Sequence, residues 1–198
     1  MEWRDAYRLL IGAVQPRPIA WVSTLGADGS RNIAPFSFFM GVCARPFTLA
    51  FAPMWRLPEV ARKDTLRNLE ETGECVVNVV SEELAERMNL TSGEYRYDVD
   101  EFELAGLTAL PSTTVAPPRI GESPVNFEAR VSQIVTLAQE AGGGSIVILR
   151  VGAIHVDERV LEGTHVVTER LRPIGRLAGD EYARTTDRFA LARPKVAR

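Results

Sequence analysis

The stretch VNFEARVSQIVTLAQEAGGGSIVILRVGAIHV, residues 125–156, holds two long apolar segments on either side of a run of glycines. The segments Val125–Leu137 and Ser145–Val156 are rich in valine and isoleucine, which favour strands. Gln139–Gly144 between them supplies three consecutive glycines for a turn. Two strands joined by a short turn pair in opposite directions, so this stretch predicts a long antiparallel hairpin.

Four shorter strand-like segments precede the hairpin: Ile19–Leu25, Arg31–Gly41, Thr48–Ala52 and Glu74–Val80. A turn with two glycines separates the first two, and Pro35 within the second requires a sheet edge or a bulge. Strands and helices do not alternate regularly, which argues against a doubly wound parallel sheet. We therefore expect a mainly β (α+β) fold, a small antiparallel barrel of six strands with a few peripheral helices.

Helices are expected in the first dozen residues and over residues 63–73 and 81–90. The first segment carries apolar side chains at helical spacing. In the second, Asp64 or Thr65 can cap the start, and Gly73 stands where a left-handed residue ends a helix. The start of this helix is of interest below, because helix N-termini attract anions.

The composition is that of an ordinary globular protein, and 198 residues favour a single domain over 1–198. With 23 basic and 26 acidic residues the net charge is −3, which argues against a nucleic-acid partner. No apolar run approaches the roughly 20 residues of a membrane-spanning helix, and the N-terminus lacks a signal-peptide pattern. Cys43 and Cys75 are expected to be buried free thiols, as in a cytoplasmic protein.

Several classes of catalytic site have no sequence basis here. There is no G-x-S-x-G segment for a nucleophilic serine and no H-E-x-x-H or C-x-x-C pair for a metal. The two histidines, His155 and His165, are best interpreted as hydrogen-bonded structural residues. We therefore predict neither a dedicated catalytic side chain nor a metal site.

Two segments could hold a ligand. In the hairpin of Pro16–Thr24 with Asn32–Phe39, small residues between aromatic ones would let a flat ligand approach the backbone, although a packed hairpin explains the same pattern. At the helix start, Lys63 and Thr65 could hold a phosphate, although a capped helix with a surface lysine is an equal alternative. A flat ring with a phosphate describes a flavin mononucleotide or a pyridoxal-type cofactor.

Six segments in their order along the chain are similar to those of a known family: PRPIAWVST (16–24), NIAPFSFF (32–39), KDTLRN (63–68), GECVVNVVSEELAERMN (73–89), YDVDEFELAGLT (97–108) and RPIGRLAGDEYA (172–183). Together they resemble the flavin reductase-like, FMN-binding split-barrel proteins, in the branch of flavoprotein oxygenases and flavin reductases. The resemblance runs from about Pro16 to Tyr182. Its joint order is specific for the family, whereas no segment is specific for a substrate.

The resemblance implies a six-stranded split barrel, a homodimer, and flavin mononucleotide in a cleft near the dimer interface, with flavin adenine dinucleotide as an alternative. Positions that match the family's segments give the candidate cofactor-binding residues. They are Arg17, Trp21, Ser23, Thr24, Asn32, Ala34, Pro35, Phe36, Ser37, Lys63, Asp64, Thr65, Arg176 and Tyr182.

The activity implied by the resemblance is an NAD(P)H-dependent flavin reductase, in which the nicotinamide passes a hydride to flavin N5. The flavin supplies the chemistry, so no catalytic side chain is required. Reduced flavin would serve an oxygenase partner or another acceptor. Two alternatives stay open, a non-catalytic FMN-binding electron carrier similar to flavoredoxin and a split-barrel scaffold without a cofactor.

Overall fold

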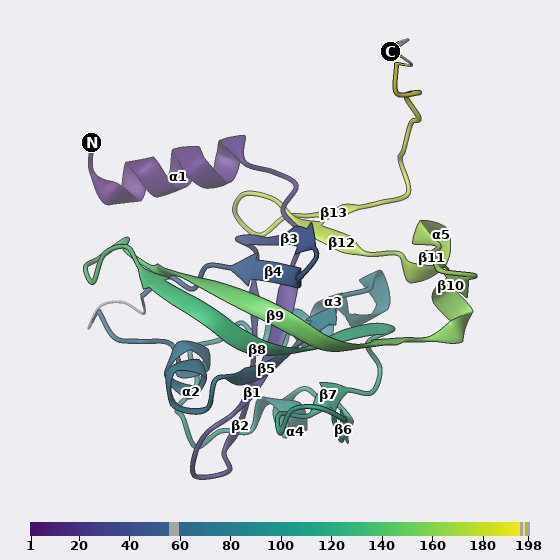
Figure 1. The fold of residues 1–198 in the computed structure, drawn as a ribbon. Helices are drawn as coiled ribbons and strands as arrows, with labels where there is room; N and C mark the ends of the chain where they lie inside the picture. Colours follow the sequence, from purple (N-terminus) through teal and green to yellow (C-terminus); the bar gives the residue numbers. More distant parts are fainter. Residues whose placement is uncertain (56–59, 195, 197–198) are drawn as a thin grey trace.

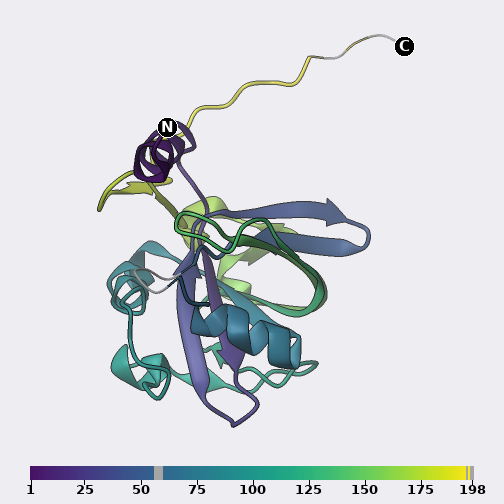
Figure 2. The same ribbon diagram turned by 90° about the vertical axis from the view of Figure 1, so that its left-hand side faces the viewer.

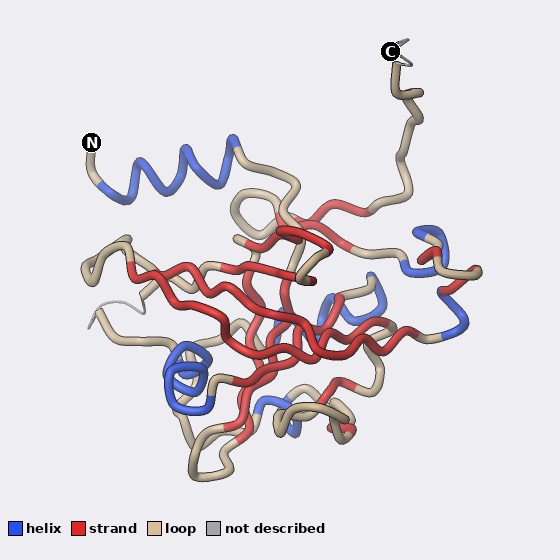
Figure 3. The backbone as a smooth tube through the Cα atoms, viewed as in Figure 1, coloured by secondary structure: helices blue, strands red, loops and turns tan. Residues whose placement is uncertain are grey.

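The computed structural model describes residues 1–55, 60–194 and 196. A long antiparallel sheet forms its centre, with short helices and small two-stranded sheets around it (Figures 1 and 3). The helices are α1 (Trp3–Ala13), α2 (Asp64–Thr72), α3 (Ala85–Leu90), α4 (Glu101–Leu104) and α5 (Thr168–Leu171), with short 3-10 helices at Glu82–Leu84 and Glu158–Val160. The strands are β1 (Ala20–Leu25), β2 (Arg31–Phe36), β3 (Phe39–Ala44), β4 (Phe47–Phe51), β5 (Glu74–Val79), β6 (Ala109–Leu110), β7 (Arg119–Ile120), β8 (Val125–Thr136), β9 (Ser145–Val156), β10 (Leu161–Glu162), β11 (His165–Val166), β12 (Ile174–Arg176) and β13 (Tyr182–Arg184).

The central sheet has seven strands in the order β2-β1-β5-β8-β9-β4-β3. The two edge strands, β2 and β3, are consecutive in the chain, and only Ser37 and Phe38 separate them. Two residues can connect these strands only if the sheet curls until its two edges lie close together. The result is a barrel in which β2 and β3 are linked by the chain but do not pair, so the barrel is split between them.

The expected number of six strands is wrong by one, because segment 31–41 forms two strands instead of one. At Ser37 and Phe38 the chain leaves its pairing with β1 and enters a pairing with β4. The carbonyl of Phe38 already accepts a hydrogen bond from the amide of Ala52, at 2.8 Å. Apolar residues continue through this corner, so the sequence pattern alone does not reveal it.

The long hairpin is confirmed. Strands β8 and β9 pair antiparallel from Val125 opposite Val156 to Thr136 opposite Ser145. They form the longest ladder of the sheet and connect β5 on one side with β4 on the other. Figure 1 shows them running across the middle of the molecule.

Alternation along β1 divides the buried residues between two cores. Ala20 and Val22 face the inside of the barrel, in a cluster that includes Phe36 and Phe51, whose ring centroids lie 5.0 Å apart. Ile19 and Trp21 face the opposite side and pack in a second cluster with side chains of α3 and α4. Successive side chains of a strand point to opposite faces, so β1 is covered on both sides.

Helix α2 begins differently from the sequence-based expectation. Lys63 is its N-cap residue and makes no side-chain capping hydrogen bond, so neither Asp64 nor Thr65 caps the helix. The end is as expected, because Gly73 has φ 71° and ends the helix in the left-handed conformation. Apolar residues of α2 join the barrel core, which fixes the helix against β1 and β2.

Both cysteines are free thiols, and only Cys75 is buried. The expectation that Cys43 is also buried is wrong, because β3 is an edge strand with exposed residues from Met40 to Ala44. Figure 2 shows the β3–β4 hairpin projecting from the rest of the molecule. Within the described part of the chain, no helix has the length and apolar character needed to cross a membrane.

Candidate functional site

Strand β2 is an edge strand, so the backbone groups on its outer edge do not pair with another strand of the sheet and can bond to other groups. In an antiparallel pair, successive residues direct their N–H groups alternately toward the partner strand and away from it. The amide of Ile33 donates to Oε2 of Glu101 at 3.2 Å, so it faces away from β1. Pro35 lies two residues further on the same side, where its missing N–H removes no bond to β1. This confirms the expectation that Pro35 requires an edge.

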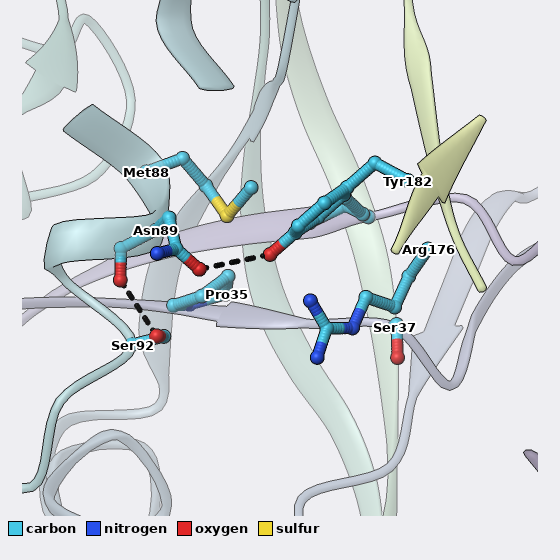
Figure 4. Close-up of a pocket in the computed structure, with 8 residues that line it drawn as sticks. Pro35, Ser37, Met88, Asn89, Ser92, Arg176 and Tyr182 are labelled. Atoms are coloured by element: carbon cyan, nitrogen blue, oxygen red, sulfur yellow. Dashed lines mark hydrogen bonds between the residues drawn. The ribbon is translucent and has the colours of Figure 1, made fainter. Parts of the chain in front are cut away.

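A pocket lies at this edge, where segments from three parts of the chain meet. Ile19, Pro35 and Ser37 form its floor near β2, α3 and the residues after it form one wall, and the β12–β13 hairpin forms another (Figure 4). Its lining residues are Ile19, Pro35, Ser37, Met88, Asn89, Ser92, Arg176 and Tyr182. Four of the predicted site residues are therefore brought together: Pro35, Ser37, Arg176 and Tyr182.

Two hydrogen bonds fix the walls of the pocket. The hydroxyl of Tyr182 donates to Oδ1 of Asn89 at 3.0 Å, which ties β13 to α3 across the opening. The hydroxyl of Ser92 donates to the carbonyl of Asn89 at 2.6 Å. Arg176 makes a cation–π contact with Tyr182, because its guanidinium carbon is 4.6 Å from the centre of the Tyr182 ring.

Arg17 lies behind the pocket and is occupied by the protein itself. Its guanidinium donates to the backbone carbonyls of Ile11, Val14 and Leu177 at 2.8–2.9 Å. A further bond goes to the hydroxyl of Ser37 at 3.2 Å. Burial lowers the pKa of Arg17, and the positive charge of Arg176 lowers it further. In this structure Arg17 therefore ties α1 and the loop after β12 to the pocket floor, rather than projecting into the pocket.

A second group of predicted residues meets at the other end of β2, beside the start of α2. The side-chain amide of Asn32 donates to the hydroxyl of Thr65 at 2.9 Å and to that of Thr24 at 3.3 Å. Asn68 donates to the same Thr24 hydroxyl at 3.0 Å. These side chains are buried and hold the first turn of α2, including Lys63 and Asp64, against the end of β2.

The two groups are joined by β2 itself. From Asn32 to Ser37 an extended chain advances about 16 Å. Alternation places Asn32 on the face that α2 covers and Pro35 and Ser37 on the face of the pocket. A ligand with its ring in the pocket and its phosphate at the N-terminus of α2 would therefore have to cross the edge of β2.

The remaining predicted residues lie inside the two cores. Trp21 is fully buried, and its indole N–H donates to the hydroxyl of Thr91 at 2.9 Å. Ser23 is also fully buried and donates to the carbonyl of Pro118 at 2.6 Å. Ala34 and Phe36 belong to the barrel core. These four residues support the strands from behind, and their side chains do not line the pocket.

Glu101 is a buried carboxyl that sequence reasoning did not single out. Burial raises its pKa to about 7, and the charges of Asp64 and Asp100 act in the same direction, against the hydrogen bond from Ile33. Because its carboxylate accepts the hydrogen bond from the amide of Ile33, the Glu101 side chain covers the part of the β2 edge between Asn32 and Pro35. A weak signal was present, since Asp100 and Glu101 open a short helix, where acidic residues are favoured.

Asn89 and Ser92 were also missed, although both line the pocket. They follow one another at helical spacing at the end of α3, which by itself is common on an exposed helix end. Only the folding of β12 and β13 against α3 gives them a role, and that contact joins residues far apart in the sequence.

His155 has a hydrogen-bonded position on β9. Its Nε2 lies 2.6 Å from Oε1 of Glu128, a fully buried carboxylate on β8. The amides of Thr113 and Thr114 donate to the same carboxylate at 2.8 and 2.6 Å. Burial favours a raised pKa for Glu128, but the hydrogen bonds from Thr114, Thr113 and His155 outweigh it and hold the pKa at about 2.

Comparisons with known proteins agree with this architecture. A family model described as the flavin reductase like domain matches residues 13–175. An uncharacterized protein of Halalkalibacterium halodurans is 39% identical over 196 residues, covering 98% of this chain and 93% of that protein. The nitrilotriacetate monooxygenase component B of Bacillus cereus has a TM-score of 0.91 at 33% identity, covering 96% of this chain and 95% of that one. The 2-nitrobenzoate 2-nitroreductase NbaA of Pseudomonas fluorescens has a TM-score of 0.88 at 34% identity, covering 98% and 93%.

These matches confirm the resemblance drawn from the six segments. The family model spans β1 through β11 and both ends of the β2 edge. The similar crystal structures cover nearly the whole chain, including the β12–β13 hairpin. The chain belongs to the flavin reductase-like family.

Proposed function

We propose that this protein binds flavin mononucleotide with its ring in the pocket beside Pro35 and Ser37 and its phosphate near the start of α2, and reduces it with NADH or NADPH. The pocket formed by Pro35, Ser37, Arg176 and Tyr182 carries this proposal, because it brings together predicted residues that are up to 147 positions apart in a member of a flavin reductase-like family. A scaffold would have no need for a polar pocket at this edge.

The residues present fit a flavin mononucleotide. At the ring end, Pro35 and Tyr182 offer flat apolar surfaces, and Ser37 and Asn89 offer hydrogen-bonding groups for the edge of a heterocycle. At the phosphate end, the first turn of α2 supplies amide groups and positive partial charge, with Lys63 as a point charge. Asn32 positions this turn by donating to the hydroxyl of Thr65, and the same side-chain amide donates to Thr24.

A flavin held by these residues would supply the hydride-transfer and electron-transfer chemistry. The protein's share is orientation and electrostatics. Hydrogen-bond donors at the ring end stabilise negative charge on the reduced ring. The chain therefore needs no side-chain acid or base for this reaction.

An oxygenase is the proposed destination of the reduced flavin. Support comes from the similarity to a protein described as a component of nitrilotriacetate monooxygenase. The alternative is an electron carrier that keeps its flavin and receives electrons from a partner. The two differ in whether the isolated protein oxidises a nicotinamide.

We also propose that the protein is a homodimer. Helix α1 has no buried residue, and its apolar side chains Tyr7 and Leu10 are exposed. The edge strand β3 exposes Met40 and Val42, with relative exposures of 58% and 50%. A second copy would cover this surface. Light scattering after gel filtration should give twice the chain mass for the wild type and a smaller mass for Met40→Asp, whereas a wild-type monomer contradicts the proposal.

Gel filtration after incubation with flavin tests the cofactor proposal. Retained yellow absorbance with FMN, and less with FAD, supports the FMN site, and oxidation of NADH or NADPH with added FMN supports the enzyme. Retained flavin without nicotinamide oxidation indicates the electron carrier. Neither retention nor oxidation would leave only the cofactor-free scaffold.

A further inference from the structure

The pocket at the β2 edge carries a full positive charge on Arg176, and the oxidised flavin ring, which is neutral, does not pair with it. Among the described residues that line it, Arg176 is the one with a full charge, and no aspartate or glutamate lines it. The described part of the chain offers the Arg176 guanidinium no ion pair, and its hydrogen bond to the protein is from one Nη2 to the carbonyl of Gly179. Most of its donors therefore have no acceptor among the residues that the structure describes.

The guanidinium is held in place although it is not paired. It stacks over the ring of Tyr182, and that ring is fixed by the hydrogen bond from Tyr182 to Asn89. The backbone of Arg176 pairs with that of Arg17, through hydrogen bonds of 2.8 and 2.9 Å. Figure 4 shows the guanidinium extending from β12 into the space between Tyr182 and Pro35. A stacked arginine of this kind is oriented before a ligand arrives.

The local field favours an anion. Arg17 lies directly behind, and its own guanidinium is enclosed by carbonyl groups of the protein. Besides burial, repulsion between the charges of Arg17 and Arg176 lowers the pKa of Arg17, and no carboxylate is among the described residues that line the pocket. A bound anion would relieve their repulsion, and a planar guanidinium matches the two oxygens of a carboxylate.

The rest of the lining is flat and partly apolar. Pro35, Met88 and Tyr182 supply carbon surface, and Ile19 lies behind them. One guanidinium in such surroundings suits a single negative charge on a small planar molecule. A pyrophosphate carries more charge than this pocket has groups to meet. The flavin's own phosphate is assigned to the start of α2, about 16 Å away along β2.

From these contacts we infer that Arg176 and Tyr182 form a subsite for the carboxylate of a small aromatic acid, which binds beside the flavin ring. The inference rests on the proposed function for the presence of the ring. The carboxylate subsite itself is a property of the protein and can be measured without flavin.

Calorimetric titration with benzoate and with its neutral isostere benzamide tests the subsite. The wild type should bind benzoate about tenfold or more tightly than benzamide, since a charge-assisted pair is lost in the amide. Arg176→Gln should weaken benzoate binding by about ten- to a hundredfold and leave benzamide unchanged. Arg176→Lys should restore part of the preference, because it keeps the charge and loses the planar fork.

Arg184→Gln is the matched control. Arg184 lies in the same hairpin and bonds to Glu82 outside the pocket lining, so the variant loses the same charge and should bind benzoate as the wild type does. Each protein is titrated without flavin and after loading with FMN. Benzoate preference in a protein that binds no FMN would refute the proposed function and leave the subsite standing.

Three results would overturn the subsite. The first is equal binding of benzoate and benzamide, or no binding of either, in both forms of the wild type. The second is unchanged benzoate affinity in Arg176→Gln. The third is a loss of FMN affinity, or a rise in the KM for NADH, in Arg176→Gln with benzoate unaffected, which would assign the guanidinium to the flavin or the dinucleotide.

Discussion

Replacing Glu128 by glutamine should weaken the fold strongly at neutral pH and much less in acid. The carboxylate is fully buried and accepts hydrogen bonds from Thr113, Thr114 and His155. Its pKa falls from the ordinary 4.5 to about 2, which corresponds to about 3 kcal/mol of folding free energy. Because the pKa is lowered in the folded state, this contribution is complete above pH 4.5 and is lost as the pH falls toward 2.

Glutamine keeps the shape but brings an NH₂ group toward neighbours that are themselves donors. Urea unfolding of wild type and Glu128→Gln, followed by tryptophan fluorescence from pH 3 to 7, measures the difference in unfolding free energy. The difference should be about 3 kcal/mol or more at pH 7 and should shrink toward pH 3. Glu86→Gln, an exposed glutamate on α3, should stay within about 0.5 kcal/mol of wild type throughout. If the difference in unfolding free energy between wild type and Glu128→Gln does not change with pH, the ionised Glu128 carboxylate is not the source of the stability.

Three further predictions concern the β2 edge. Lys63→Ala should weaken FMN binding by about ten- to a hundredfold in a fluorescence titration, because the phosphate loses a charged partner. An unchanged Kd would show that the phosphate does not bind at the start of α2. Thr65→Val should lower the unfolding free energy by about 1–3 kcal/mol in urea, because the amide of Asn32 loses a buried acceptor; stability equal to wild type contradicts this. Glu101→Gln should gain stability over wild type as the pH rises from 4.5 through 7, by up to about 3 kcal/mol, since burial penalises the charged carboxylate that wild type must form there. A difference that is flat between pH 5 and 8 would show that Glu101 is not buried in solution.

Much of the fold follows from local patterns. The long hairpin and β5 are continuous apolar segments with clear turn residues at their ends, and the structure has them where the pattern predicts. The split of segment 31–41 was not predictable, because Ser37 and Phe38 look like strand residues, and only pairing with β4 bends the chain there. The start of α2 was misjudged for a similar reason. The Thr65 hydroxyl that could have capped the helix is used by Asn32 on a neighbouring strand.

The candidate site was predicted in outline only. Family segments near Pro35 and Ser37 lead to the pocket floor, and Arg176 and Tyr182 lead to one wall. The same segments also include residues whose side chains face a core. Each segment forms a strand, and successive side chains of a strand point to opposite faces, so only some of its residues can reach the pocket. The opposite wall, on α3, depends on a contact between distant parts of the chain that no local pattern encodes.

Anaerobic titration of the FMN-loaded protein with NADH and with NADPH measures whether a nicotinamide reduces the bound flavin. We expect one of the two nicotinamides to bleach the flavin absorbance in proportion to the amount added, and oxygen to restore that absorbance. Flavin that is retained but stays oxidised with both nicotinamides would contradict the proposed reductase. A protein that retains no flavin and catalyses no FMN-dependent oxidation of either nicotinamide would contradict the flavin site itself.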